Sequence, residues 1–163
     1  MSAAGIDVCL ADYAHAAHRE ALVLLLDAYA RDPAGGATPL TAFARENLAD
    51  ELGRRPGAFS VLAFEGAHPV GLVNCFEGFS TFACKPLVNV HDVVVLESHR
   101  GRRIAQRMLG KVEEVARQRG ACKLTLEVLS GNARAMKAYE GEGFAGYQLD
   151  PRFGCATFMQ KKL

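Results

Sequence analysis

Six residues in the second half of the chain have the types and spacing that can hold a phosphate group. They read Arg100-Gly101-Arg102-Arg103-Ile104-Ala105 and lie where a β-branched run gives way to a helical pattern. A helix N-terminus presents unpaired amides and a partial positive charge, which together bind anions. Small residues at Gly101 and Ala105 would let a phosphate approach the backbone. The segment predicts a phosphate site, although a solvated helix face after a glycine turn would have the same residues.

Positive charge is concentrated around this segment. Residues 97–119 include seven basic and three acidic residues, whereas the whole 163-residue chain has a net charge of +1. Such a balanced total argues against a dedicated nucleic-acid binder. The segment also lacks the Lys-Ser/Thr pair of a Walker A loop, so ATP hydrolysis is disfavoured.

Helical and extended patterns alternate along the chain. Apolar spacing predicts helices over 13–31, 41–52, 102–119 and 132–142, and strands over 6–11, 59–64, 70–76, 87–96, 123–129, 144–149 and 156–161. The strand–helix–strand unit over 87–129 predicts a parallel strand pair. Half of the residues are hydrophobic, which is enough for a real core. We therefore expect one α/β domain over residues 1–163.

A second group of residues follows the predicted strand at 123–129. Asn132, Ala133, Tyr139, Gly143 and Phe144 form the pattern N-A-x-x-x-x-x-Y-x-x-x-G-F. Together with the basic segment, this pattern resembles the GNAT superfamily of acyl-CoA-dependent N-acyltransferases, whose phosphate loop reads R/Q-x-x-G-x-G/A. The resemblance runs over residues 90–144 and extends to most of the chain in element order. Arg103 departs from the family pattern, because the loop glycine is expected there.

The resemblance implies a GNAT fold, with a mixed, mostly antiparallel sheet, helices on both faces and one parallel strand pair splayed apart for acetyl-CoA. Val93, Val94 and Val95 would bond the pantetheine arm, and the amides near Val94 and Val95 would polarise the thioester carbonyl. The phosphates would be held by Arg100, Gly101, Arg102, Arg103, Ile104 and Ala105. Asn132 would cap its helix and touch the pantetheine chain.

The implied chemistry is acetyl transfer to an amine, which must first lose a proton because an ordinary primary ammonium has a pKa of about 10.4. His91 and Asp92 lie where the family often places acidic residues. A histidine suits general base work near neutral pH, and Asp92 could attract the ammonium group. Alternation along a strand places these two side chains on opposite faces. Glu77 and Glu127 are weaker candidates for the base, and Tyr139 is the implied proton donor to the leaving CoA thiolate.

The expected activity is acetyl-CoA-dependent N-acetyl transfer to a small-molecule primary amine, by direct attack in a ternary complex. Residues 76–92 distantly resemble spermidine/spermine acetyltransferases, and aromatic rings with a carboxylate suit a polyamine-like cation. The residues expected to shape this acceptor pocket are Tyr29, Phe76, Phe79, Phe82, Tyr147 and Phe153, together with Glu77.

Other functions remain open on the sequence alone. The chain could acetylate a protein N-terminus or lysine, sense acyl-CoA without catalysis, or bind nucleic acid through residues 100–119. Five scattered cysteines and no secretory pattern at the N-terminus predict a cytoplasmic protein with reduced thiols and no metal site. We expect no nucleic-acid or membrane partner. A homodimer is an alternative to a monomer, because dimers are common in the family that the chain resembles.

Overall fold

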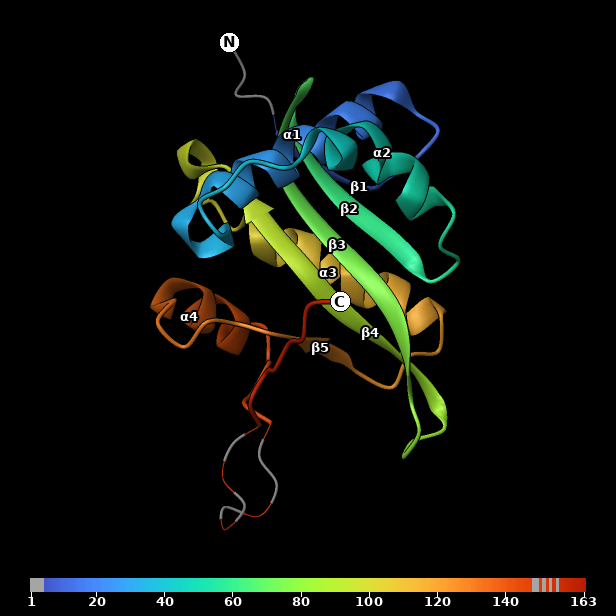
Figure 1. The fold of residues 1–163 in the computed structure, drawn as a ribbon, viewed down its shortest axis with the longest axis vertical. Coiled ribbons are helices and arrows are strands. Elements are labelled where there is room, and N and C mark those ends of the chain that lie inside the picture. Colours follow the sequence, from blue (N-terminus) through green and yellow to red (C-terminus); the bar gives the residue numbers. More distant parts are fainter. Residues whose placement is uncertain (1–4, 148–149, 151, 153, 155) are drawn as a thin grey trace. The chain divides into compact units, whose positions relative to one another are not determined.

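The computed structural model describes residues 5–147, 150, 152, 154 and 156–163 and forms two compact units, residues 1–126 and 127–163. The first unit is built from five strands and three α-helices (Figure 1). These are β1 (Ile6–Leu10), α1 (Ala16–Arg31), α2 (Ala42–Gly53), β2 (Ala58–Glu65), β3 (His68–Ser80), β4 (Lys85–Val95), α3 (Ile104–Gln118) and β5 (Leu124–Leu126). Two short 3-10 turns, η1 (Pro33–Gly35) and η2 (Glu97–His99), follow α1 and β4.

The strands form one mixed sheet in the order β1-β2-β3-β4-β5. The first four strands pair antiparallel, and β4 pairs with β5 in parallel. This confirms the predicted α/β class and the parallel pair on either side of the α3 crossover. The parallel ladder joins only Val88–Val90 to Leu124–Leu126, so β4 continues for five residues beyond its last β5 partner.

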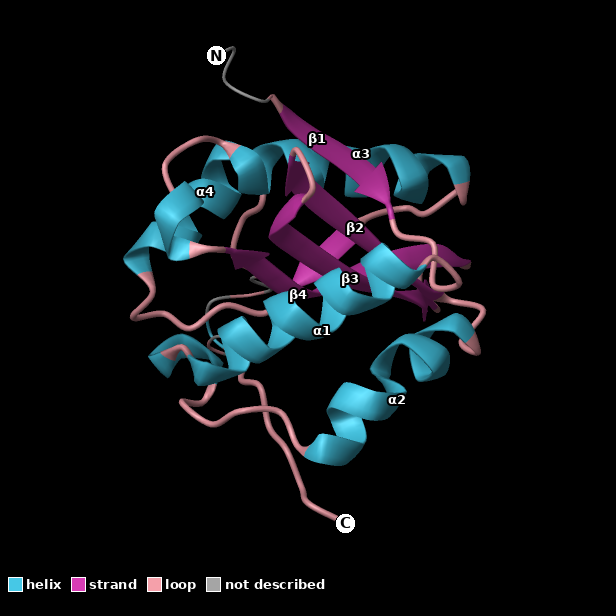
Figure 2. Cartoon of the chain, turned by 90° about the horizontal axis from the view of Figure 1, so that it is seen from above, coloured by secondary structure: helices cyan, strands magenta, loops and turns pink. Residues whose placement is uncertain are grey.

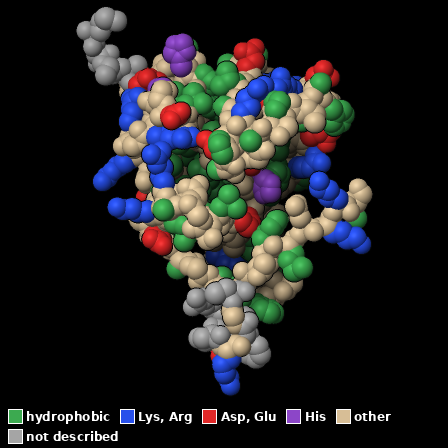
Figure 3. Space-filling model, turned by 60° about the vertical axis from the view of Figure 1, so that its left-hand side comes forward, with side chains coloured by type: hydrophobic (Ala, Val, Ile, Leu, Met, Phe, Trp, Pro, Cys, Tyr) green, Lys and Arg blue, Asp and Glu red, His purple; other side chains and the backbone are tan. Residues whose placement is uncertain are grey.

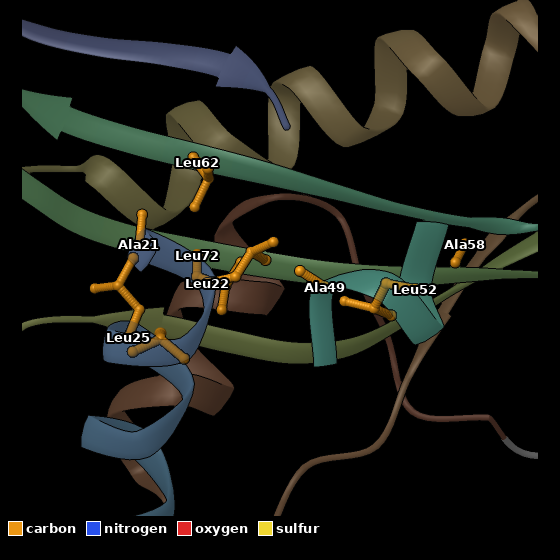
Figure 4. Close-up of a cluster of buried hydrophobic side chains, with 9 residues drawn as sticks. Ala21, Leu22, Leu25, Ala49, Leu52, Ala58, Leu62 and Leu72 are labelled. Atoms are coloured by element: carbon orange, nitrogen blue, oxygen red, sulfur yellow. The ribbon is translucent and has the colours of Figure 1, made fainter. Parts of the chain in front are cut away.

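Helices cover both faces of this sheet (Figure 2). On one face α1 and α2 pack against β2, β3 and β4, with Leu22 and Leu25 of α1 fully buried. Figure 4 shows the α1 and α2 side chains meeting Leu62 and Leu72, which lie opposite each other on neighbouring strands. This cluster forms because a helix that is apolar on one side must bury that side to gain hydrophobic free energy.

The other face is covered by α3. Its buried residues recur at helical spacing and are Ile104, Met108, Leu109, Val112, Val115 and Ala116. The helix approaches β3 so closely that a Cβ on Gly71 would lie 2.8 Å from Met108 Cε. A larger residue at this position would displace the Met108 side chain, so the glycine allows the close packing of α3 on β3.

Beyond Phe76, β3 and β4 continue as a hairpin that pairs with neither β1 nor β2. Phe79 and Phe82 lie on this hairpin and are 59% and 99% exposed. The two rings are therefore open to solvent, and their place in an acceptor pocket stays a prediction. Phe79 lies near the end of β3 and Phe82 in the turn before β4, and no described helix covers this part of the hairpin.

The second unit contains α4 (Ala133–Gly141). None of the described residues after Gly143 belongs to a strand, and Phe158 and Met159 are 76% and 85% exposed. The predicted hairpin over 144–149 and 156–161 is thus wrong for the described residues, because alternating apolar residues form a strand only where a partner ladder is present. Phe153 and residues 148–149 lie outside the described part of the chain. Among the described helices, none is long and apolar enough to cross a bilayer.

Candidate active site

The end of β4 presents main-chain groups on the edge from which β5 has departed. Leu96 N donates to Val70 O, and the register between β3 and β4 runs without interruption from Val95 to Asp92. Bonded and non-bonded pairs alternate in an antiparallel ladder, so Val94 bonds to β3 while the N–H groups of Val93 and Val95 point to the opposite edge. Amides near Val94 and Val95 were predicted to polarise the thioester carbonyl. At this edge of the sheet, the amides available for that role are those of Val93 and Val95. An extended ligand arm can add to such an edge as a strand would.

The connection from β4 to α3 has the backbone of an anion site. Gly101 and Arg103 adopt positive φ values of 81° and 57°. Arg103 occupies the N-cap position of α3 and makes no capping hydrogen bond with its side chain. The first amides of α3 have no intrahelical partner, and the helix dipole adds partial positive charge to them. The predicted phosphate segment therefore folds as an uncapped helix N-terminus.

Arginine stands where the loop glycine is expected and adopts a left-handed backbone conformation. A left-handed conformation costs a residue with a Cβ about 1–2 kcal/mol, so Arg103 is held there by its surroundings. The neighbouring connection is tied to the sheet by ion pairs. Arg102 Nη2 lies 2.6 Å from Glu65 Oε1, and His99 Nε2 lies 3.1 Å from Glu65 Oε2. The hydrogen bond from Arg102, followed by that from His99, lowers the pKa of Glu65.

The three loop arginines have different partners. Arg100 donates from Nε to Val95 O at 3.2 Å and pairs through Nη2 with Asp32 at 3.1 Å. Arg102 is bound to Glu65, as described above. Arg103 makes no ion pair or side-chain hydrogen bond to any described residue. Its guanidinium is thus the one among the three that is available to a phosphate. Figure 3 shows one face of the molecule, where Lys and Arg side chains lie in several places with acidic side chains between them.

His91 and Asp92 lie on the same face of the sheet, which corrects the expectation that they point to opposite faces. The β3–β4 register shifts between Asn74 and Cys75, so His91 is an extra residue in β4. Asp92 accepts a hydrogen bond from Asn74 Nδ2 at 3.0 Å, and the His91 ring packs edge-on against Phe76 at 5.3 Å. Asn74 and Phe76 are two positions apart on β3 and share a face. A β-bulge interrupts the period of two, which is the reason that the alternation failed.

Glu77 lies elsewhere. It pairs with Val88 in the register and faces Arg119, with 3.4 Å between Arg119 Nη1 and its Oε2. The Arg119 guanidinium also covers the ring of Phe59 on the α3 side of the sheet. Glu77 therefore lies on the α3 side of the sheet, opposite to the side that carries His91 and Asp92, and its part in an acceptor pocket stays a prediction. Glu127 is exposed and begins the second unit.

Three polar residues that the sequence patterns did not single out are linked to Asp92 by successive hydrogen bonds, namely Asn74, Ser60 and Tyr13. Ser60 and Asn74 are buried in the sheet, and Ser60 also hydrogen-bonds Tyr13 at 2.9 Å. A signal was present for Ser60 and Asn74, since each is the one polar residue in its predicted strand, 59–64 or 70–76. Tyr29 of α1 is also close: burial, and secondarily the charges of Asp92 and Asp32, raise the pKa of its phenol.

The buried thiol does not compete for the chemistry. Burial raises the pKa of Cys75 to about 12, so it is a neutral thiol near neutral pH and a poor nucleophile. Burial also raises the pKa of Cys9. Among the described residues, no group of three or more His, Cys, Asp or Glu is placed to hold a metal ion.

In the second unit, Asn132 Oδ1 accepts from Ala135 N at 3.1 Å, so the predicted N-cap of α4 is confirmed. Tyr139 lies near the end of α4, with its ring edge-on to Phe144 at 5.9 Å. The motif residues Tyr139 and Phe144 thus support each other locally, through a ring contact and a backbone hydrogen bond from Phe144 N to Tyr139 O.

Comparison with known proteins identifies the class. The family described as "Acetyltransferase (GNAT) family" matches residues 21–144, which is more than half of the chain. The chain therefore belongs to the GNAT acetyltransferase family.

Individual relatives are more distant. The streptothricin acetyltransferase of Streptomyces lavendulae is 37% identical over 75 residues, which are 46% of this chain and 40% of that protein. The matched part thus spans less than half of that relative's length. Among solved structures, a probable acetyltransferase is similar with a TM-score of 0.79 and 23% identity, covering 96% of this chain and 99% of the other. An aminoglycoside N-acetyltransferase in complex with CoA is similar with a TM-score of 0.74 and 16% identity, covering 98% and 96%. At these identities the structural likeness shows the fold.

Proposed function

We propose that the chain transfers the acetyl group of acetyl-CoA to a primary amine of a small molecule, by direct attack in a ternary complex. One observation carries the proposal. The same strand, β4, offers free edge amides at Val93 and Val95 and, on its α1/α2 face, the carboxylate of Asp92. A thioester arm and a cationic amine would thus be held within a few residues of each other, as direct transfer requires.

The residues around the α3 N-terminus suit the cofactor. The first amides of α3 and the Arg103 guanidinium would hold the phosphates, with Gly101 leaving room for their approach. Arg100 and Arg102 would keep the loop in place through Asp32 and Glu65. When bound, acetyl-CoA supplies the activated acetyl group.

The chain's own residues would handle the charges and protons. The amides of Val93 and Val95 would donate to the pantetheine arm and to the thioester carbonyl. Asp92 would bind the acceptor ammonium, and His91 or Asp92, directly or through water, would remove its proton. On family resemblance we assign Tyr139 as the proton donor to the leaving thiolate and Asn132 as a contact of the pantetheine chain.

The names of the relatives favour a small acceptor. Streptothricin and aminoglycosides are the substrates named for two similar proteins, and both proteins are acetyltransferases. A polyamine-like acceptor has lost part of its support, because Phe79, Phe82 and Glu77 lie away from Asp92. A ribosomal-protein-alanine N-acetyltransferase of Brucella melitensis shares the fold with a TM-score of 0.73, at 18% identity and with 97% and 100% of the two chains covered. Transfer to a protein N-terminus is therefore the alternative to test.

Thermal unfolding with and without acetyl-CoA tests the cofactor first. A ligand at 100 times its Kd stabilises the native state by about 2.7 kcal/mol, and we expect a clear rise in Tm. Release of the CoA thiol is then measured with a panel of aminoglycosides, polyamines and short peptides. Thiol release with a small amine supports the proposal, and release with peptides alone supports the alternative. No Tm shift at saturating acetyl-CoA would reject the cofactor site.

A further inference from the structure

A row of polar side chains crosses the sheet beneath α1. Ser60 of β2, Asn74 of β3 and Asp92 of β4 lie directly opposite one another in the register. Ser60 and Asn74 are 0% and 2% exposed. The next row on the same face is apolar and consists of Leu62, Leu72 and Val94. Apolar side chains would also pack well in place of Ser60, Asn74 and Asp92, so stability alone does not explain why polar groups are buried there.

The donor and acceptor groups of this row allow each hydrogen bond only one direction. An ionised Asp92 carboxylate only accepts, so it must receive its 3.0 Å hydrogen bond from Asn74 Nδ2. Asn74 Oδ1 then faces Ser60 and takes the one proton of the Ser60 hydroxyl at 2.6 Å. Ser60 Oγ is left to accept from Tyr13 Oη at 2.9 Å. The chain of donors therefore runs from Tyr13 through Ser60 and Asn74 to Asp92.

The residues at both ends of this hydrogen-bonded series, Tyr13 and Asp92, keep its donors and acceptors in one orientation. Burial raises the pKa of Tyr13, and the hydrogen bond with Ser60 opposes that rise only in part, so the phenol keeps its donor proton near neutral pH. At the other end Asn74 holds Asp92 Oδ2, and no described residue donates to Asp92 Oδ1. A flip of the Asn74 amide would set its oxygen against the Asp92 carboxylate and would lose the hydrogen bond that Asn74 Oδ1 accepts from Ser60.

We propose that Tyr13, Ser60 and Asn74 are positioning residues that lock the Asp92 carboxylate in the orientation that receives the acceptor ammonium on Oδ1. The inference rests on the proposed function, because it takes the acceptor to be a cationic amine bound by Asp92. These three residues never touch the acceptor and act through Asp92 alone.

The test is a double-mutant cycle between Ser60→Ala and Asp92→Asn. Kinetics with an amine that the wild-type protein acetylates give KM and kcat, and calorimetry gives the Kd for acetyl-CoA. We expect Ser60→Ala to raise the amine KM by about tenfold, because a hydrogen-bonded charge loses its alignment, with kcat and the acetyl-CoA Kd nearly unchanged. In the Asp92→Asn background the same Ser60→Ala change should have no further effect on KM. Calorimetry of amine binding to the CoA-saturated protein gives the same cycle if Asp92→Asn turns over too slowly.

Two further variants keep the test decisive. Tyr13→Phe removes only the first donor, and we expect a smaller rise in KM, of about twofold to threefold. Leu62→Val is the matched control in the apolar row, and it should lower Tm with the amine KM unchanged.

The proposal is overturned if Ser60→Ala and Tyr13→Phe leave KM unchanged as Leu62→Val does, or if the Ser60→Ala effect persists in full without the Asp92 carboxylate. A wild-type protein that acetylates none of the amines would instead refute the proposed function, and this inference with it. If the wild-type protein acetylates a small amine but the variants leave its KM unchanged, only the positioning role of Tyr13, Ser60 and Asn74 is refuted.

Discussion

The two faces of the sheet are built differently. The fully buried side chains of the sheet's α3 face are apolar and include Val61, Ala63 and Val73, and α3, with Met108 and Val112 fully buried, packs against the strands that carry them. The α1/α2 face has an equally buried leucine cluster, but a polar row with Asp92 at its open end interrupts it. The α3 face serves mainly stability, whereas the other face gives up part of its apolar packing to place a carboxylate. Mutations should therefore separate stability from activity by face.

The largest effects are expected from Met108→Ala and Asp92→Asn. Met108 is fully buried, so its truncation should lower the free energy of unfolding by about 2–5 kcal/mol, with kcat/KM of the folded fraction unchanged. Asp92→Asn should lower kcat/KM for the amine by about 100-fold, with less than about 1 kcal/mol of stability lost. Urea unfolding and steady-state kinetics measure both quantities. A proportional loss of stability and activity in both variants would contradict the contrast between the faces.

An intermediate effect is expected where β4 meets α3. Arg103→Glu should weaken acetyl-CoA binding by about tenfold, because it replaces the unpaired guanidinium with a charge that repels phosphate. Arg103→Gly should weaken binding less and raise Tm by a few degrees, since glycine adopts the φ of 57° without strain. Calorimetry and thermal scans give the two readouts.

Arg117→Glu is the matched control for this change. Arg117 is an exposed residue near the end of α3 that pairs with Glu113 of the same helix, so the same charge reversal should leave the acetyl-CoA affinity nearly unaltered. Equal affinities for Arg103→Glu and Arg117→Glu would show that Arg103 does not face the phosphates.

The smallest effect concerns pH and the Glu65 ion pairs. Arg102 and His99 lower the pKa of Glu65 in the folded protein, so Glu65 contributes stability above its unfolded pKa of about 4.5 and loses it as pH falls through the lower folded value. The Tm difference between wild type and Glu65→Gln should be small at pH 7, because the pair is partly exposed, and should vanish below that window. Thermal scans between pH 3 and pH 7 measure it. A difference that grows towards pH 3 would contradict the assignment.

Local sequence patterns were sufficient for most of the secondary structure. Apolar spacing located α1, α2, α3 and α4 to within three residues at most ends, and the Asn132 cap was identified correctly. The start of α3 after β4 was also predicted, because a helix N-terminus after a strand is a feature of consecutive residues. The predicted strand 123–129 shrank to Leu124–Leu126, and the last hairpin was not found among the described residues. Strands depend on partners that a local pattern does not contain.

The site was only partly predictable for the same reason. The sequence by itself determined the family and the α/β class and predicted the segment that would hold phosphates, since these depend on residue types at short spacing. Only the tertiary structure decided that a bulge turns His91 and Asp92 to one face and that Glu77 pairs with Arg119. It also decided that Arg100 and Arg102 form ion pairs, whereas Arg103 forms none with a described residue. It also brought Tyr13, Ser60 and Asn74 into line with Asp92 across three strands. Register and ion pairing join residues far apart in the chain, and the free energy that selects those pairs arises only when the sheet is assembled.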